Sequence, residues 1–147
     1  MIADANREHF AKLERMYLEA DTNRYYLPRC AIESGKCEIC IDIRDDFFHS
    51  GGAIHGSVYF KLLDDSSYFA AASLDSRNHL LTVNYSVSFL RPVTQGELKA
   101  LGTVVIRSQR TTVAESKAYD YKGRLVAIGN GTFMPSQLAL DARVGYR

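Results

Sequence analysis

The sequence has little net charge and no long apolar run. Its 147 residues carry 18 basic and 17 acidic side chains, which gives a formal net charge of +1. The overall composition therefore provides no attraction to nucleic acid or to an anionic membrane. No stretch approaches the roughly 20 apolar residues that span a bilayer, and Met1 to Tyr17 lacks the pattern of a secretory signal. We expect a cytoplasmic protein without nucleic-acid or membrane partners.

Cysteine is also scarce. The three residues Cys30, Cys37 and Cys40 leave one thiol unpaired in any disulfide scheme, which favours a reducing compartment. Cys37 and Cys40 form a C-x-x-C, which can be half of a zinc site or a redox pair. The chain has no second C-x-x-C and no His pair at ligand spacing, and residues 36–43 fit a strand better. We therefore expect no metal and no cofactor.

Length and composition indicate one folded domain. Hydrophobic residues make up 46% and charged residues 24% of the chain, and no repeat, linker or low-complexity segment interrupts it. We expect a single domain over residues 1–147, with an N-terminal helix at about 3–18 and a core at about 29–135. Residues 136–147 form a tail with no predicted structure.

Hydrophobic periodicity predicts the order of the elements. Phe10, Leu13, Met16 and Tyr17 follow helical spacing, as in an amphipathic helix that lies on the domain. Residues 57–73 are apolar nearly all round, which is typical of a helix in a core. Alternation and turn residues predict a short hairpin around Ser34-Gly35 and then four long strands, at 81–89, 98–106, 111–121 and 124–134. Together these elements predict an α+β fold in which a curved antiparallel sheet wraps around one central apolar helix.

The first long strand shows strict alternation. One predicted face carries Leu81, Val83, Tyr85, Val87 and Phe89, and the other carries Thr82, Asn84, Ser86 and Ser88. A polar face without Lys or Glu is unusual for a strand that faces water. We expect this face to pack on another subunit, and an ordinary solvated face is the alternative.

Two adjacent carboxylates, Asp64 and Asp65, lie in the middle of the apolar helix. Burying a bare carboxylate is costly, so each must be paired, protonated or functional. Lys61 is at helical spacing from both, and Asp65, four residues later, is the better candidate for an ion pair. The two neighbouring carboxylates therefore need separate explanations.

The segment before the helix collects groups suited to bind an anion. His55 stands directly before the helix and His49 six residues earlier, in a loop rich in glycine and acidic residues. The Gly56 amide is expected at the helix N-terminus, where an unpaired donor and the helix dipole favour developing negative charge. Structural hydrogen bonding is the alternative role for either histidine.

These motifs resemble those of a known family. His55-Gly56-Ser57 is followed by Asp64 nine residues after the histidine, and the next strand ends in Ser-Phe-Leu-Arg-Pro at residues 88–92. The pattern is similar to the PaaI-like, or 4HBT-type, branch of the hotdog-fold thioesterases, over about residues 42–134. The resemblance implies the hotdog fold and an obligate homodimer, commonly paired again into a homotetramer, with the carboxylate and the His-Gly loop on different subunits.

The resemblance also implies an activity, hydrolysis of an acyl-CoA thioester to a free acid and CoA. Asp64 would be the general base or nucleophile, and the Gly56 amide would polarise the thioester carbonyl. His55 would orient the carbonyl, and Thr82 would hold the attacking water. His49 occupies the position where the family often has Asn or Gln, and adds a titratable group.

Five further residues are candidates for substrate binding. Ser57 replaces the second glycine of the motif and adds a side chain near the acyl group, and Asp65 lies beside the predicted site. Arg91, Arg107 and Arg110 are expected at strand ends or turns, where they could meet the phosphates of CoA or simply be solvated.

Two other functions are compatible with the same scaffold. A non-catalytic acyl-CoA-binding module would explain the departures at His49 and Ser57, but would not need a carboxylate at position 64. A hydratase or dehydratase acting on enoyl thioesters would need the acid and histidine at a different spacing.

Overall fold

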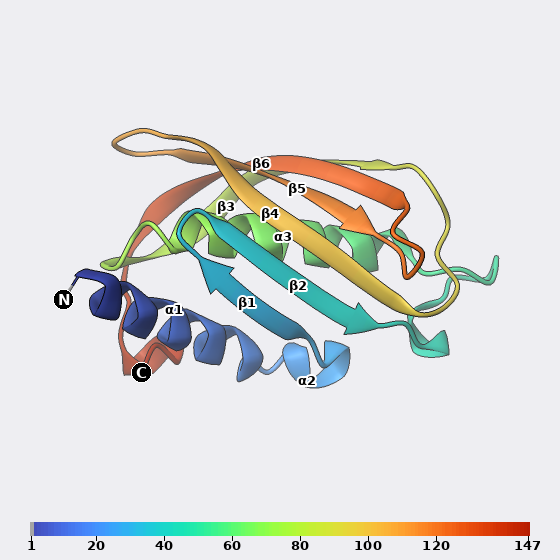
Figure 1. Cartoon of the computed structure of the whole chain (residues 1–147), viewed down its shortest axis with the longest axis horizontal. Coiled ribbons are helices and arrows are strands. Elements are labelled where there is room, and N and C mark those ends of the chain that lie inside the picture. The colour runs from blue at the N-terminus through green and yellow to red at the C-terminus, as the bar shows by residue number, and fades with distance from the viewer. Residues whose placement is uncertain (1) are drawn as a thin grey trace.

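Six antiparallel strands form one curved sheet that packs against a long central helix (Figure 1). The computed structural model describes residues 2–147. The strand order is β1-β2-β4-β5-β6-β3, with β1 (Arg29–Glu33), β2 (Lys36–Asp42), β3 (Asn78–Phe89), β4 (Glu97–Arg107), β5 (Thr112–Tyr119) and β6 (Leu125–Ala139). The helices are α1 (Ile2–Leu18), α2 (Asn23–Tyr26) and α3 (Gly56–Ala72), with 3-10 turns η1 (Asp45–Phe47) and η2 (Ala142–Val144). The predicted hotdog arrangement is confirmed.

Helix α3 occupies the concave side of the sheet, where Leu62 and Leu63 are fully buried. Each such side chain contributes roughly 1.5–3 kcal/mol when it leaves water. Gly102 on β4 lets the helix approach closely, because a Cβ on this residue would lie 2.1 Å from the Ser66 carbonyl oxygen. Burial is not complete all round the helix, since Phe60 is 40% exposed.

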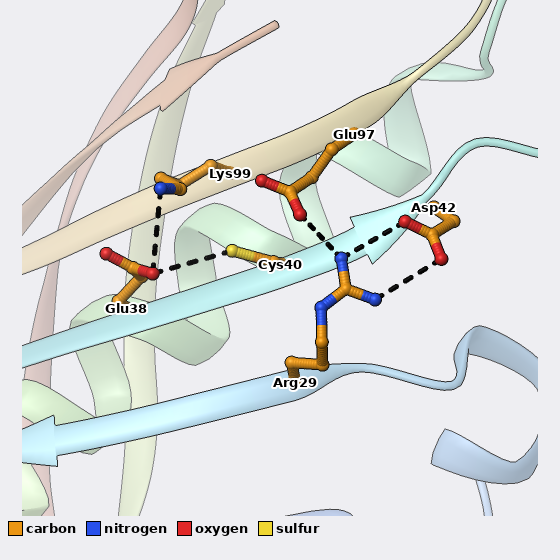
Figure 2. Close-up of polar contacts among 6 residues, drawn as sticks. All are labelled: Arg29, Glu38, Cys40, Asp42, Glu97 and Lys99. Carbon is orange, nitrogen blue, oxygen red and sulfur yellow. Dashed lines mark hydrogen bonds and ion pairs between the residues drawn. The ribbon is translucent and has the colours of Figure 1, made fainter. Parts of the chain in front are cut away.

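The outer face of β1, β2 and β4 is held by exposed ion pairs (Figure 2). The Arg29 guanidinium bridges Asp42 at 3.1 Å and Glu97 at 2.7 Å, and so ties three neighbouring strands together. Exposed pairs of this kind are worth at most about 1 kcal/mol each.

The two thiols of the C-x-x-C lie on opposite faces of β2. Cys40 is on the outer face shown in Figure 2, whereas Cys37 is buried in the core with its Sγ 3.8 Å from that of Cys30. Residues an odd number of positions apart in a strand point to opposite faces, so this motif cannot bind one metal ion or form one disulfide. Burial raises the pKa of Cys40 to about 12, and that of Cys37 well above its usual value. Between residues 2 and 147, no group of three or more His, Cys, Asp or Glu side chains is placed to hold a metal ion.

The strict alternation predicted for β3 is wrong. Opposite β6 the register shifts between Thr82 and Asn84, so a β-bulge at Val83 inserts one extra residue. Leu81 and Val83 are therefore exposed, at 56% and 54%, while Tyr85 packs on the core. Thr82 is consequently on the helix side of the strand, the opposite of what simple alternation predicts. The role of the remaining polar side chains of β3 in subunit contact stays a prediction.

The N- and C-terminal segments pack together at the end of α3 (Figure 1). His9 on α1 donates from Nε2 to the Ala72 carbonyl oxygen at 3.1 Å, and its Nδ1 accepts from the Tyr146 hydroxyl at 2.8 Å. Strand β6 continues to Ala139, beyond the predicted end at residue 134. Of the helices in the described chain, none has the length and hydrophobicity needed to span a membrane.

Candidate active site

Helix α3 begins with His55 as its N-cap residue. His55 has extended backbone angles, φ −64° and ψ 148°, and its Nδ1 accepts a hydrogen bond from the Ser57 backbone N–H at 3.0 Å. The Ser57 hydroxyl lies 2.8 Å from the same nitrogen. Because Nδ1 accepts from the backbone amide, the proton of the neutral ring is on Nε2 and the hydroxyl donates to Nδ1. Nε2 therefore remains available as a donor.

The Gly56 backbone N–H is an unpaired donor. In residues 2–147 it has no hydrogen-bond partner, whereas the amides of Ser57 and Val58 both donate to His55. An unpaired N–H at the positive end of a helix stabilises negative charge. The Phe89 ring approaches from β3, and a Cβ at position 56 would lie 3.1 Å from it. A glycine therefore lets the ring and the free amide share this space.

A cavity of about 360 Å³ opens beside Gly56. Its walls combine the aromatic rings of Tyr59 and Phe89 with His49 and Arg91. The Tyr59 hydroxyl donates to the Arg91 carbonyl oxygen at 2.8 Å, which fastens the end of β3 to the start of α3. His49 accepts a hydrogen bond at Nδ1 from the Gly51 backbone N–H at 2.9 Å. The structure thus brings His49, Gly56 and Arg91 together, as the sequence predicted for the first two.

Asp64 is half-buried two turns further along α3. Its Oδ1 accepts a hydrogen bond from the Thr82 hydroxyl on β3 at 3.0 Å, and in the described chain Oδ2 has no hydrogen-bond partner. Burial is the main cause that raises the pKa of Asp64 to about 6. The Thr82 hydrogen bond lowers it, the Asp65 charge raises it and the Lys61 charge lowers it, in decreasing order. Asp64 is thus a carboxylate with one constrained and one free oxygen.

Asp65 points to a different set of partners. Its Oδ2 lies 2.7 Å from the Lys61 ammonium and accepts a hydrogen bond from the Tyr17 hydroxyl at 2.8 Å. The expected ion pair between Lys61 and Asp65 is confirmed. These internal contacts occupy Oδ2 of Asp65. The binding of substrate by Asp65 stays a prediction.

Asp64 and Gly56 are too far apart in one chain to act on the same carbonyl carbon. They are separated by eight residues of one helix, a rise of about 12 Å, whereas reacting atoms must approach to roughly 3 Å. One chain therefore contributes two half-sites, one at the start of α3 and one at its middle.

The other two arginines predicted to bind CoA, Arg107 and Arg110, lie toward the opposite end of α3 from Gly56. Arg107 ends β4, and Arg110 lies in the β4–β5 turn that projects beyond the C-terminal end of the helix (Figure 1). The preceding part of β4 contacts Gly35, whose amide donates to Ser73 at that helix end. Within one chain, Arg107 and Arg110 are therefore separated from Arg91 and Gly56.

Two residues near the site were missed by sequence analysis. Tyr17 was predicted only as part of an apolar stripe, and its hydroxyl contact with Asp65 spans 48 residues. Phe89 was predicted as one of several residues on a strand face, with no signal that it covers Gly56. Both contacts are set by how elements pack, which periodicity in the sequence does not report.

Comparison with known proteins shows the family of this chain. The model of the thioesterase superfamily (4HBT) matches residues 51–127. A candidate esterase of Saccharolobus solfataricus is 26% identical over 103 residues, 70% of this chain and 69% of that protein. Another, from Sulfurisphaera tokodaii, is 28% identical over 100 residues, 68% of this chain and 74% of that protein.

Solved structures share the fold. The Escherichia coli PaaI protein from the phenylacetic acid degradation operon superimposes with a TM-score of 0.83 at 17% identity, over 91% of this chain and 97% of that one. A thioesterase family protein from Silicibacter pomeroyi gives 0.77 at 23% identity, over 84% and 96%. The chain has the hotdog fold and belongs to the thioesterase superfamily.

Proposed function

We propose that this chain hydrolyses acyl-CoA thioesters to a free acid and CoA. The observation that carries the proposal is the Asp64 carboxylate, which is half-buried and held by Thr82 through one oxygen only. A pKa raised by burial to about 6 suits a group that gains and loses a proton near neutral pH. The unpaired Gly56 amide supplies a donor for the carbonyl oxygen.

Two routes to hydrolysis use the free Asp64 oxygen. In one, Asp64 takes a proton from water, and the hydroxide adds to the thioester carbon. In the other, the carboxylate itself adds and forms a mixed anhydride, which water then hydrolyses. In both, negative charge develops on the carbonyl oxygen beside the Gly56 N–H, and collapse of the intermediate breaks the carbon–sulfur bond to release the CoA thiolate. Both routes need Asp64 ionised.

A second copy of the chain would complete this site. Strand β3 is at the edge of the sheet and exposes Leu81 and Val83 beside Thr82. Phe60, one helical turn before Asp64 on the same face, is also exposed. Apolar side chains beside the unpaired edge of a strand suit contact with another protein surface. We infer a homodimer in which Asp64 faces the Gly56 amide of the partner subunit, with further pairing into a tetramer.

The other residues have subsidiary roles in this proposal. His55, with its proton on Nε2, would donate to the thioester and orient it. His49 and Ser57 would border the acyl group, and Thr82 would hold the Asp64 carboxylate in place for the attack on substrate or water. Arg91, at the cavity beside Gly56, would meet a phosphate of CoA.

Thiol release from a panel of short alkyl-, long alkyl- and aryl-CoA thioesters tests the proposal. We expect Asp64→Asn to lower kcat by at least about 100-fold, the scale of a lost general base or nucleophile. Asp65→Asn is the matched control on the same helix, and a milder loss is expected because Asp65 Oδ2 binds Lys61 and Tyr17. Near-wild-type activity of Asp64→Asn would refute the assignment.

The same panel separates the alternative functions. CoA-ester binding without thiol release in the wild-type protein would favour a non-catalytic binding module. Hydration of crotonyl-CoA without thiol release would favour a hydratase. Greater damage from Asp65→Asn than from Asp64→Asn would mean that the neighbouring carboxylate does the chemistry.

A further inference from the structure

A partly buried cluster surrounds the carboxylate next to Asp64. Tyr17, at the end of α1, donates to Asp65 Oδ2, and the Lys61 ammonium lies 2.7 Å from the same oxygen. The Lys61 and Asp65 side chains are only 13% and 21% exposed. The ammonium also lies over the rings of Tyr17 and Tyr26, at 5.4 and 4.8 Å from their centroids. Charges this enclosed are screened less by solvent than a surface pair.

Lys61 and Asp65 are the charged groups that act on Asp64. The other polar contact of Asp64 is the hydroxyl of Thr82 on β3. The Asp64 charge also raises the pKa of two phenols, those of Tyr68 on α3 and Tyr85 on β3. Among the described residues of the other strands, the side chains that are buried in or packed against the core carry no formal charge. The ionisable ones among them are the thiols of Cys30, Cys37 and Cys40 on β1 and β2.

We propose that Tyr17 and Lys61 are positioning residues that act through Asp65 to set the pH at which the Asp64 carboxylate becomes ionised. The ammonium and the phenol hydroxyl both bind the oxygen of Asp65, so they offset a negative charge that would otherwise repel an ionised Asp64. Lys61 also attracts the Asp64 carboxylate directly. The inference rests on the proposed function, in which ionised Asp64 is the reactive form.

The Tyr17 hydroxyl contributes a hydrogen bond to Asp65 in addition to the packing of its ring. The Tyr17 ring already contacts Phe69 on α3 edge to face, with centroids 4.9 Å apart, and the side chain is 4% exposed. A phenylalanine would keep this contact, so the hydroxyl is not needed to dock α1. Tyr17 lies on the N-terminal helix α1, outside the segment 51–127 that matches the superfamily model.

Removing the positive or the negative charge of the cluster should shift the pKa of Asp64 in opposite directions. We expect Lys61→Met to raise the apparent pKa of Asp64 by about half a pH unit or more, and Asp65→Asn to lower it by a similar amount. The double variant Lys61→Met/Asp65→Asn restores the net charge and should return close to wild type. Tyr17→Phe should shift the pKa upward, and Tyr26→Phe, which removes a hydroxyl without a hydrogen bond to Asp65, should leave it unchanged.

Two readouts on the 147-residue chain test these expectations. Carboxyl ¹³C NMR titration reports Asp64 without substrate, and the acidic limb of kcat/KM against pH reports it during turnover. Shifts of opposite sign in the two single variants support the inference. Shifts of the same sign, or none, in folded variants overturn it, and Lys61→Gln replaces Lys61→Met if the latter does not fold. NMR shifts without thioesterase activity would sustain the cluster's role and refute the proposed function. Thioesterase activity whose acidic limb stays at the same pH in the variants would support the proposed function and refute the role of the cluster.

Discussion

The hydroxyl of Thr82 donates to Oδ1 of Asp64 across 18 residues of sequence, at 3.0 Å. The contact joins the edge strand β3 to the central helix and exists because the bulge at Val83 changes which residues of the strand face inward. It fixes one oxygen of the carboxylate and leaves the other free. Thr82 therefore restrains the orientation of Asp64 and lowers its pKa, against the larger effect of burial.

Thr82→Val should weaken the proposed reaction by acting on Asp64. Loss of the hydrogen bond removes an interaction that lowers the pKa of this carboxyl, so its pKa should rise above about 6. The acidic limb of kcat/KM should move to higher pH, and a rise of about one pH unit lowers the ionised fraction of Asp64 at pH 7 about twofold. Thr82→Ser keeps the hydroxyl and should stay close to wild type. Equal profiles for the two variants would show that the hydrogen bond is unimportant.

The stability of the protein should fall as Asp64 ionises. Its pKa is about 6 in the fold against a usual value of 3.8, so between these values the folded state holds a proton that the unfolded chain has released. The free energy of unfolding therefore falls as pH rises from 3.8 to about 6. Below pH 3.8 the carboxyl is protonated in both states, so Asp64 adds no pH dependence there. Asp64→Asn should be more stable than wild type by about 1–2 kcal/mol above pH 6, allowing for the partial solvent exposure of the group. Urea unfolding of both proteins across the window measures this, and a constant difference at all pH values would contradict it.

Gly56→Ala should lower activity through a steric conflict with Phe89. A Cβ at position 56 would lie 3.1 Å from the Phe89 ring, so the ring or the start of α3 must move away from the free amide. We expect at least about a tenfold loss in kcat/KM, since misplacing an oxyanion donor is costly. Phe89→Leu in the Gly56→Ala background should recover part of it. No recovery would mean that the methyl group acts on the substrate instead of on the ring.

Gly131 should be essential for stability. A Cβ there would lie 2.3 Å from the Tyr85 ring and 2.6 Å from the Asn84 carbonyl oxygen, just after the bulge. Gly131→Ala should cost about 3 kcal/mol or more, because neither the backbone nor the enclosed ring can yield cheaply. Asn130→Ala on the exposed face is the control, with an expected change within about 0.5 kcal/mol. Similar urea midpoints for the two variants would refute the packing argument.

Sequence patterns predicted the fold well where each element keeps one period. The apolar run of 57–73 and the alternation of the later strands gave α3, β4 and β5 nearly at their observed bounds, whereas β6 continues past its predicted end at residue 134 to Ala139. Alternation failed within β3, because a bulge inserts a residue without changing composition. The short helix α2 also escaped prediction, since its four residues have no periodic signal.

The candidate site was predictable where spacing along one helix sufficed. Asp64, Asp65 and Lys61 lie on consecutive turns of α3, so the pairing of Lys61 with Asp65 follows from the sequence. The contacts of Tyr17 and Phe89 depend on how α1 and the end of β3 pack on that helix. Such long-range contacts follow from tertiary packing, which a single sequence does not encode in any local pattern.

The missing side chain at Gly102 also fixes the position of α3 along the sheet. The Ser66 carbonyl lies where a methyl group would otherwise be, so the helix backbone packs against β4 at Gly102, the one glycine of that strand. Sliding by one residue would bring that turn of the helix against a side chain of β4. Asp64, less than one turn away from Ser66, is thereby held in register with Thr82. The alignment of the proposed catalytic carboxylate thus depends on the absence of a side chain at a residue of another strand, β4.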